Sequence, residues 1–271
     1  MSAAPKADLA NAAETAERAA LSCFVITKNE ADRIRPALEA VKDWVDEIVV
    51  VDCGSSDATC AIAEELGARV IHQDWLGFGP QKRFAEDQCR NDWVLNIDAD
   101  EVISAALAQE ISTLLGSAPP SSAYSLRILD VYPGADRPRP WADDYRQPRL
   151  YDRRVVHFST SPVHDSLELA GARAPCLKGA VLHFSVRSIE DHFRKSLERA
   201  HYNAEHAKPK PRAALRLRLV TEFPMAFIRY YFWRRHFTGG LMGFQIAMSA
   251  AFSRFARIAL MLEKAKRDAQ R

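Results

Sequence analysis

The amino-acid sequence predicts an α/β protein, in which a mostly parallel sheet flanked by helices precedes a helical, basic C-terminal region. Short apolar runs rich in β-branched residues alternate with segments of helical spacing through the first 115 residues. The hydrophobic share of 48% and the charged share of 27% are typical of a globular chain. Residues 1–170 carry 17 basic and 28 acidic side chains, whereas residues 171–271 carry 20 and 7, although the whole chain of 271 residues has a net charge of only +2. Such asymmetry is typical of a basic tail that meets an anionic partner.

The first half of the chain accounts for the sheet and its helices. Four short apolar runs predict buried strands, at residues 21–27, 47–52, 69–72 and 93–97. Four segments with helical spacing or breaker signals predict helices, at residues 33–45, 58–66, 81–88 and 104–115. Ser56 or Asp57 is expected to cap the second helix and Ser104 the fourth. Because the two kinds of element alternate, the strands should run parallel with helices on both faces.

The second half changes character. Strand-like runs at residues 124–131 and 149–151 flank a loop at 133–148 that contains four prolines, and this loop is either a binding loop or a plain connection. Helices are expected at 189–208, 215–233 and 243–267. The predicted organisation is a poorly ordered leader (1–19), an α/β domain (20–187, with halves of about 20–115 and 116–187) and a helical basic region (188–271).

Several protein classes are disfavoured by what the sequence lacks. The five cysteines are odd in number and form no Cys-x-x-Cys pair, which argues against a disulfide framework and a structural zinc site. No glycine-rich phosphate loop indicates a dinucleotide fold or a P-loop enzyme. The N-terminus lacks an apolar signal core, and the stretch 236–253 is too polar for a clear membrane span. No RNA- or DNA-binding signature accompanies the basic region, so we do not expect nucleic acid as a partner.

Polar side chains gather where the predicted strands end. Asn29 and Glu30 follow the first strand, and three further groups follow the others: Asp52, Ser55 and Asp57; Lys82 and Arg83; Asp98 and Asp100. Ligands of open parallel sheets bind beyond the carboxyl ends of the strands, so these groups should face one crevice. Convergent carboxylates are costly unless a cation or ligand hydroxyls accompany them. Oxygen ligands suit Mg²⁺ or Mn²⁺, which usually also bridge substrate phosphates.

Three stretches of the sequence resemble glycosyltransferase family 2, the inverting nucleotide-sugar transferases with a GT-A fold. They are residues 27–30 (TKNE), 52–57 (DCGSSD) and 96–101 (NIDADE), and the likeness is strong over about residues 20–115. Further stretches resemble the subgroup of lipopolysaccharide core β-1,4-glucosyltransferases: residues 79–83, 163–165, 182–184, 234–237, 239–240 and 243–244.

The resemblance implies roles for the strand-end residues. Glu30 and Asp52 would hydrogen-bond the ribose and base of the donor, Asp98 and Asp100 would hold a divalent cation and the diphosphate, and Lys82 and Arg83 would neutralise phosphate charge. The full donor set expected from the family is Thr27, Asn29, Glu30, Asp52, Ser55, Asp57, Lys82, Arg83 and Asp98. Asp165 is the candidate general base, although its side chain is shorter than the glutamate that is equally expected there. His164 is a further candidate for touching the metal or the acceptor, and His183 for lining the same site.

The leading hypothesis is therefore an inverting transferase that moves a hexose, with UDP-glucose as one candidate donor, to a lipopolysaccharide core or another lipid-linked glycan. The enzyme would be cytoplasmic and peripheral on the inner face of the plasma membrane, because the aromatic run 223–233 and Arg234 and Arg235 suit an anionic surface. Trp141 and Tyr145 are candidates for contacts with the acceptor or the membrane. The alternative functions are a polyprenyl-phosphate sugar transferase and a non-catalytic nucleotide- or carbohydrate-binding module. For the C-terminal region, the alternative to membrane contact is that its aromatic side chains pack on the α/β domain.

Overall fold

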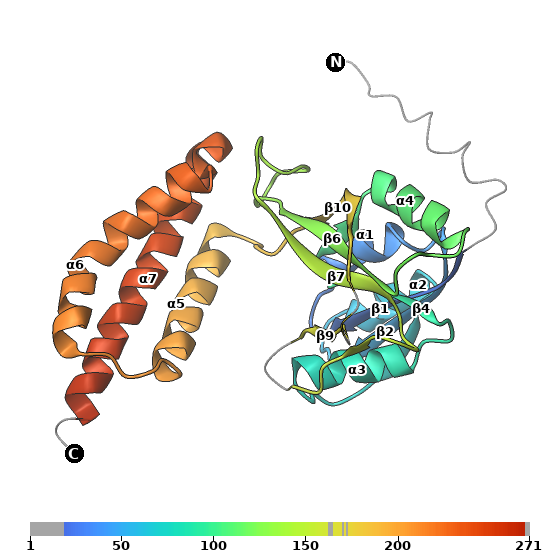
Figure 1. Cartoon of the computed structure of the whole chain (residues 1–271), viewed down its shortest axis with the longest axis horizontal. Helices are drawn as coiled ribbons and strands as arrows, with labels where there is room; N and C mark the ends of the chain where they lie inside the picture. The colour runs from blue at the N-terminus through green and yellow to red at the C-terminus, as the bar shows by residue number, and fades with distance from the viewer. Residues whose placement is uncertain (1–18, 162–164, 170, 172, 269–271) are drawn as a thin grey trace. The chain divides into compact units, whose positions relative to one another are not determined.

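A computed structural model of the chain describes residues 19–161, 165–169, 171 and 173–268 (Figure 1). The chain divides into two compact units. The first contains the residues up to Leu129 together with Asp144–His183, and the second contains Asp130–Asp143 and the residues from Phe184 onward. The loop predicted at 133–148 thus falls mainly with the C-terminal helices.

The first unit is built on an eight-stranded sheet with the order β3-β2-β1-β4-β7-β6-β10-β5. The strands are β1 (Ala19–Thr27), β2 (Val45–Asp52), β3 (Arg69–His72), β4 (Trp93–Asn96), β5 (Glu101–Ile103), β6 (Ala123–Asp130), β7 (Asp144–Asp152) and β10 (Cys176–His183). A separate pair is formed by β8 (His157–Phe158) and β9 (Leu167–Glu168). Strands β1 to β4 pair in parallel, which confirms the predicted α/β class. The pairings of β7 with β4 and with β6, and of β10 with β5, are antiparallel.

Helices cover both faces of this sheet: α1 (Ile34–Glu39), α2 (Thr59–Glu65), α3 (Phe78–Asp87) and α4 (Ala105–Leu115). Alternate residues of β1 point to opposite faces. Leu21 and Val25 join the core that includes residues of α1, α2 and α4, whereas Phe24 joins the core on the α3 side. Figure 1 shows α3 on the opposite side of the sheet from α1 and α4. Strand ends are therefore held by packing on both faces.

The end of α1 and the N-cap of α2 differ from the prediction, whereas the N-cap of α4 agrees with it. Helix α1 ends at Glu39 instead of residue 45, and the chain continues in turns where the Trp44 indole donates to the Ala40 carbonyl at 2.8 Å. Neither Ser56 nor Asp57 is the N-cap of α2, which is Ala58 without a side-chain cap. Ser104 caps α4 as predicted, since its side chain accepts from the Leu107 N–H.

The second unit is helical: α5 (Ile189–Glu205), α6 (Arg212–Ile228), the π-helix η1 (Arg229–Trp233), the 3₁₀-helix η2 (His236–Gly239) and α7 (Gly240–Asp268). Helix α7 lies alongside both α5 and α6 (Figure 1). Gly243 lets the first turn of α7 pack closely against η2, because a Cβ at this position would lie 1.9 Å from the His236 carbonyl oxygen. Within the part of the chain that the structure describes, no helix combines the length and the apolar character needed to cross a membrane.

Candidate active site

A pocket of about 340 Å³ opens at the carboxyl ends of the parallel strands. Its lining comes from the ends of β1, β2 and β4, from α3 and β10, and from the loops before α3 and β9: Ile26, Thr27, Lys28, Glu30, Cys53, Trp75, Phe78, Lys82, Asp98, Ala99, Asp100, Asp165 and His183. This is the edge at which ligands of parallel sheets bind. Of the predicted site residues, the structure thus brings Thr27, Glu30, Lys82, Asp98, Asp100 and Asp165 together.

The loop after β1 is fixed to the turn after β2 by polar side chains. Asn29 has a left-handed backbone with φ of 56°, its N–H donates to Ser55 Oγ at 2.8 Å, and its Oδ1 accepts from the Ser56 N–H at 2.8 Å. Asp57 accepts from the N–H of Ala31 at 3.2 Å and of Thr59 at 3.0 Å. Asn29 and Ser55 therefore hold the two segments together, and Asp57 adds a contact to Ala31, although none of the three residues lines the pocket itself.

Asp52 ends β2 and is buried. Burial disfavours its charged form, but hydrogen bonds from the Ser55 hydroxyl and from the N–H groups of Ser55 and Gly54 outweigh burial and hold the pKa of Asp52 below its usual value. The carboxylate is thus kept ionised and in a fixed orientation beside the pocket.

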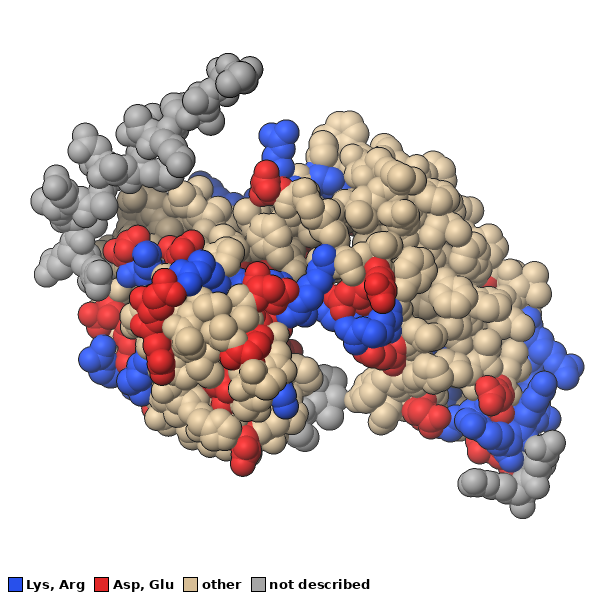
Figure 2. Space-filling view, turned by 180° about the vertical axis from the view of Figure 1, so that it is seen from behind, with Lys and Arg blue, Asp and Glu red and all other residues tan. Residues whose placement is uncertain are grey.

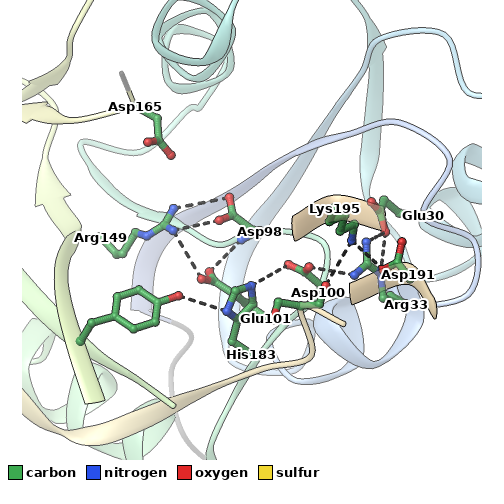
Figure 3. Close-up of polar contacts among 12 residues, drawn as sticks. Glu30, Arg33, Asp98, Asp100, Glu101, Arg149, Asp165, His183, Asp191 and Lys195 are labelled. Carbon is green, nitrogen blue, oxygen red and sulfur yellow. Dashed lines mark hydrogen bonds and ion pairs between the residues drawn. The ribbon is translucent and has the colours of Figure 1, made fainter. Parts of the chain in front are cut away.

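Asp98 sits between two cations. Arg149 Nη2 lies 2.9 Å from one carboxylate oxygen (Figure 3), and Lys82 Nζ lies 3.0 Å from the other. Burial alone would raise the pKa of Asp98, but Arg149 and Lys82 hold it well below its usual range. Asp98 is therefore an anion at neutral pH, and its carboxylate is oriented by Arg149 from β7 and by Lys82 from α3.

Arg149 also reaches a second acid. Its Nη2 lies 3.4 Å from Glu101 Oε1, and its Nη1 donates to the Asn96 side-chain oxygen. Glu101 is 1% exposed and its Oε2 accepts the Asp98 N–H at 2.9 Å, which fixes the backbone between the two aspartates. Burial raises the pKa of Glu101 despite Arg149.

Asp100 faces a different pair of groups. Arg33 Nη1 lies 2.9 Å from its Oδ2 and His183 Nε2 lies 3.5 Å from its Oδ1 (Figure 3). Burial raises the pKa of Asp100, but His183 and Arg33 together lower it below its usual value. The Tyr145 hydroxyl lies 3.1 Å from His183 Nδ1, so Tyr145 orients the imidazole from the outside. Asp98 and Asp100 thus line the same pocket, but each is held in place by different side chains.

Lys82 links the two sides of the pocket. It is 1% exposed, and its ammonium lies 3.0 Å from Asp165 Oδ2 as well as 3.0 Å from Asp98. The Asp165 side chain is 42% exposed, so it is held at one oxygen and open to the pocket. A carboxylate held in this way can accept a proton from a ligand hydroxyl.

Thr27 contributes a hydroxyl without a partner. Thr27 is 5% exposed, and no hydrogen bond to its Oγ1 is found within the described residues. Buried hydroxyls are nearly always hydrogen-bonded, so this one is an exception in the wall of the pocket. Glu30 lies at the same strand end and accepts from Arg33 Nε at 2.8 Å.

The remaining predicted residues lie elsewhere. Arg83 does not line the pocket, because its guanidinium pairs with Glu86 at 3.1 Å and Asp87 at 3.4 Å on α3. Trp141, Arg234 and Arg235 belong to the second unit. His164 lies outside the described residues.

Two side chains that pair with the acids of the site, Arg149 and Arg33, were missed by sequence reasoning. Arg149 begins the strand predicted at 149–151, and an arginine in a strand that is expected to be buried is a signal for an ion pair. In the structure Arg149 is 4% exposed in β7. Arg33 is the first residue of the helix predicted over 33–45, and only the fold brings it to Asp100.

The pocket offers few protein ligands to a metal. Among the described residues, no group of three or more His, Cys, Asp and Glu side chains could hold an ion alone. Asp100 and His183 nevertheless present one carboxylate and one imidazole to the pocket. Mg²⁺ is usually held by one or two carboxylates plus substrate phosphates, so this set fits an ion that arrives with a diphosphate.

Comparison with known proteins gives a consistent result. The sequence model of Glycosyl transferase family 2 matches residues 22–166. A protein of Rickettsia felis named as an uncharacterized glycosyltransferase is 40% identical over 257 residues, which are 90% of this chain and 89% of the relative. The lipopolysaccharide core biosynthesis glycosyltransferase LpsC of Rhizobium meliloti is 27% identical, covering 90% of this chain and 92% of LpsC. The mannosyltransferase PcManGT of Pyrobaculum calidifontis, solved with GDP-Man and Mn²⁺, shares the fold with a TM-score of 0.51 at 17% identity, covering 88% of this chain and 87% of PcManGT.

Proposed function

Because the chain belongs to glycosyl transferase family 2, we propose that it is an inverting enzyme that moves a hexose from a nucleoside-diphosphate sugar to a lipopolysaccharide core or another lipid-linked glycan. The observation that carries this proposal is the convergence of Asp98, Asp100 and Asp165 on one pocket at the carboxyl edge of the sheet. The acceptor class is supported by the likeness to LpsC over most of both chains.

The donor would bind with its nucleoside against the ends of β1 and β2. Thr27 and Glu30 line the pocket there, and the Glu30 carboxylate suits the hydrogen-bond donors of a ribose or a base. Asp52 already accepts from Gly54 and Ser55, so its proposed role is to keep the turn after β2 in place and to offer its remaining acceptor capacity to the nucleoside.

The diphosphate would lie at Asp98 and Asp100. We assign Asp100 and His183 to a divalent cation, Mg²⁺ or Mn²⁺, as PcManGT was solved with Mn²⁺. When bound, such an ion neutralises charge that develops on the leaving diphosphate. Asp98 is fixed by Arg149 and Lys82, so its proposed role is to set the electrostatics of the phosphate site and to orient the ammonium of Lys82.

Asp165 is the proposed general base. Its carboxylate oxygen that does not contact Lys82 would take the proton of the acceptor hydroxyl. The acceptor oxygen would at the same time attack the anomeric carbon from the face opposite the diphosphate, which leaves. One displacement inverts the anomeric centre, so no covalent nucleophile is required. Lys82 Nζ lies 3.0 Å from Asp165 Oδ2 and fixes the direction of this carboxylate, which makes Lys82 a positioning residue for the base.

We also propose that the enzyme works at the cytoplasmic face of a membrane. The second unit supports this with exposed apolar side chains such as Trp233 (84% exposed), next to Arg234 and Arg235. Co-sedimentation with vesicles should require anionic lipid and weaken as salt is added, because exposed charges are screened at high ionic strength. Binding that ignores both lipid charge and salt would contradict this part of the proposal.

Transfer itself is tested with radiolabelled nucleotide sugars. Purified enzyme, Mn²⁺ and a lipid extract are incubated with each of a panel of UDP- and GDP-sugars, and label is counted in the lipid fraction. We expect one donor to be used, with inversion at the labelled anomeric carbon. Label transferred with retention, or to no acceptor with any donor, would refute the proposed reaction.

A further inference from the structure

The second unit contains a pocket of its own. Its volume is about 850 Å³, and it forms where α6 and η1 meet α7. The lining includes Arg229, Arg234, Arg235 and Arg254 together with the apolar side chains of Ile228 and Trp233. The pocket therefore combines cationic and apolar walls, and no step of the proposed transfer at the sheet edge uses it.

The positive charge of this pocket is not balanced by its own acids. Within the described residues, no ion pair joins Arg229, Arg234 or Arg235 to a carboxylate. Glu222, which is a lining residue, already lies 2.7 Å from Arg218 and 3.0 Å from Arg254. The other acid of the lining, Asp143, is exposed at the surface.

The arginines are placed by irregular backbone that other side chains hold. Arg229 opens the π-helix η1, and Arg235 has a left-handed φ of 53° before η2. The Arg234 carbonyl accepts from Arg139 Nη2 at 2.8 Å, and the Arg234 guanidinium stacks on the Tyr230 ring at 5.4 Å. Single-turn π-helices and left-handed non-glycine residues are costly and gather at binding sites.

The apolar side chains beside these arginines are exposed. Trp233 is 84%, Met225 67% and Ile228 55% exposed, and all three line the pocket. The face of the helical unit visible in Figure 2 is mostly uncharged. Guanidinium groups recognise phosphate with paired N–H donors, and exposed aromatic and aliphatic residues suit the apolar part of an amphiphile.

We propose that this pocket binds the phosphate group of a membrane-resident phosphoglycolipid, namely the lipid-linked acceptor, with its apolar part against Ile228 and Trp233. The identity of the lipid as acceptor rests on the proposed function, whereas the recognition of a phosphorylated amphiphile rests on the pocket. Charge complementarity selects the phosphate, and the exposed apolar rim selects a lipid over a free anion.

The test compares two arginines of similar setting in the full chain. Arg229→Gln removes a pocket guanidinium, whereas Arg216→Gln removes one on α6 that is also exposed and is not part of the lining. Binding of short-chain phosphatidic acid and of inorganic phosphate is measured by calorimetry. Binding of phosphatidylcholine vesicles, with and without phosphatidic acid, is measured by sedimentation.

Arg229→Gln should lower the affinity for short-chain phosphatidic acid roughly tenfold, because a hydrogen bond to a charged group is lost. Arg216→Gln should leave this affinity unchanged. Trp233→Ala should weaken binding of the lipid but not binding of inorganic phosphate. Leu217→Ala is the matched control, because Leu217 is exposed on α6 and lies outside the lining. Equal losses for Arg229→Gln and Arg216→Gln would show diffuse surface attraction and overturn the proposal. Inorganic phosphate that binds as tightly as the lipid would also overturn it.

Nucleotide-sugar binding in the same preparations separates the two proposals. If the wild-type protein binds no nucleotide sugar, the proposed function fails whatever the pocket does. If the donor binds but Arg229→Gln behaves like Arg216→Gln, only the lipid pocket is refuted. Donor binding retained by the variants also shows that they are folded.

Discussion

Replacing Arg149 by methionine should destabilise the protein more than any single surface change. Arg149 is 4% exposed, and its guanidinium lies 2.9 Å from Asp98 and 3.4 Å from Glu101. Methionine keeps most of the side-chain volume in β7 but removes the charge. Asp98 would keep only Lys82, and the buried Glu101 would lose its cation.

The size of the effect follows from burial. Removing one partner of a buried ion pair costs about 3–5 kcal/mol, because the remaining charge has lost its compensation. Arg127→Met is the matched control on the neighbouring strand β6, where Arg127 pairs with Asp144 at 2.6 Å but is 38% exposed. An exposed pair of this kind contributes about 0–1 kcal/mol. The two arginine-to-methionine changes should therefore differ by several kcal/mol in the free energy of unfolding.

Urea denaturation measures this difference, and its pH dependence tests the cause. Arg149 and Lys82 outweigh burial and lower the pKa of Asp98 in the folded state, so the stability that they supply is present above the ordinary aspartate pKa of about 4. That stability is lost as pH falls below this value toward the lower folded pKa. Without Arg149 the folded pKa of Asp98 rises, so less stability is lost in acid. The gap between wild type and Arg149→Met should therefore narrow below about pH 4.

Two results would refute the reasoning on Arg149. One is a destabilisation no larger than that of Arg127→Met, which would mean that the buried network contributes nothing. The other is a gap that stays constant as pH falls, which would mean that the loss comes from packing and not from the ion pair.

Three further changes test other parts of the structure. Asp165→Asn should lower the transfer rate about 10²–10⁴-fold while calorimetry finds donor binding unchanged, and loss of donor binding would contradict its assignment as the base. Asp100→Asn should raise the Mn²⁺ concentration needed for donor binding roughly tenfold or more, and an unchanged metal requirement would remove Asp100 from the cation site. Gly179→Ala should destabilise by about 1–3 kcal/mol in urea, because a Cβ would lie 2.5 Å from Leu107 Cα, and an unchanged midpoint would show that α4 can move away from β10.

The parallel half of the fold could be predicted because its information is local. Each strand from β1 to β4 is a short apolar run that ends in polar residues, and the alternation with helices fixes the parallel direction. Asp98 and Asp100 could be placed at the site for the same reason, since they directly follow β4.

The partners of these acids could not be predicted, because they depend on strand pairings distant in sequence. Arg149 reaches Asp98 only because β7 runs antiparallel beside β4. His183 was expected to line the site, and it does, but its contact with Asp100 depends on the place of β10 in the sheet. A run such as residues 149–151 predicts a strand but not its neighbour or direction.

The expectation that Lys82 and Arg83 act together shows a second limit. Adjacent helix residues point about 100° apart, so two neighbours on α3 need not face one pocket. Lys82 is buried against Asp98 and Asp165, whereas Arg83 pairs with Glu86 and Asp87 on its own helix. The sequence shows that Lys82 and Arg83 are adjacent, but it does not show which of the two side chains projects from α3 toward the pocket.

The most direct test of the central claim is the thermal unfolding of the wild-type protein with UDP- and GDP-sugars, with and without Mn²⁺. A ligand at about 100 times its dissociation constant stabilises the folded state by about 2.7 kcal/mol, which raises the midpoint by roughly 5–10 °C for a protein of this size. We predict such a shift for one nucleotide sugar and only when Mn²⁺ is present. No shift with any nucleotide sugar, or the same shift without Mn²⁺, would contradict a donor site built on Asp98 and Asp100.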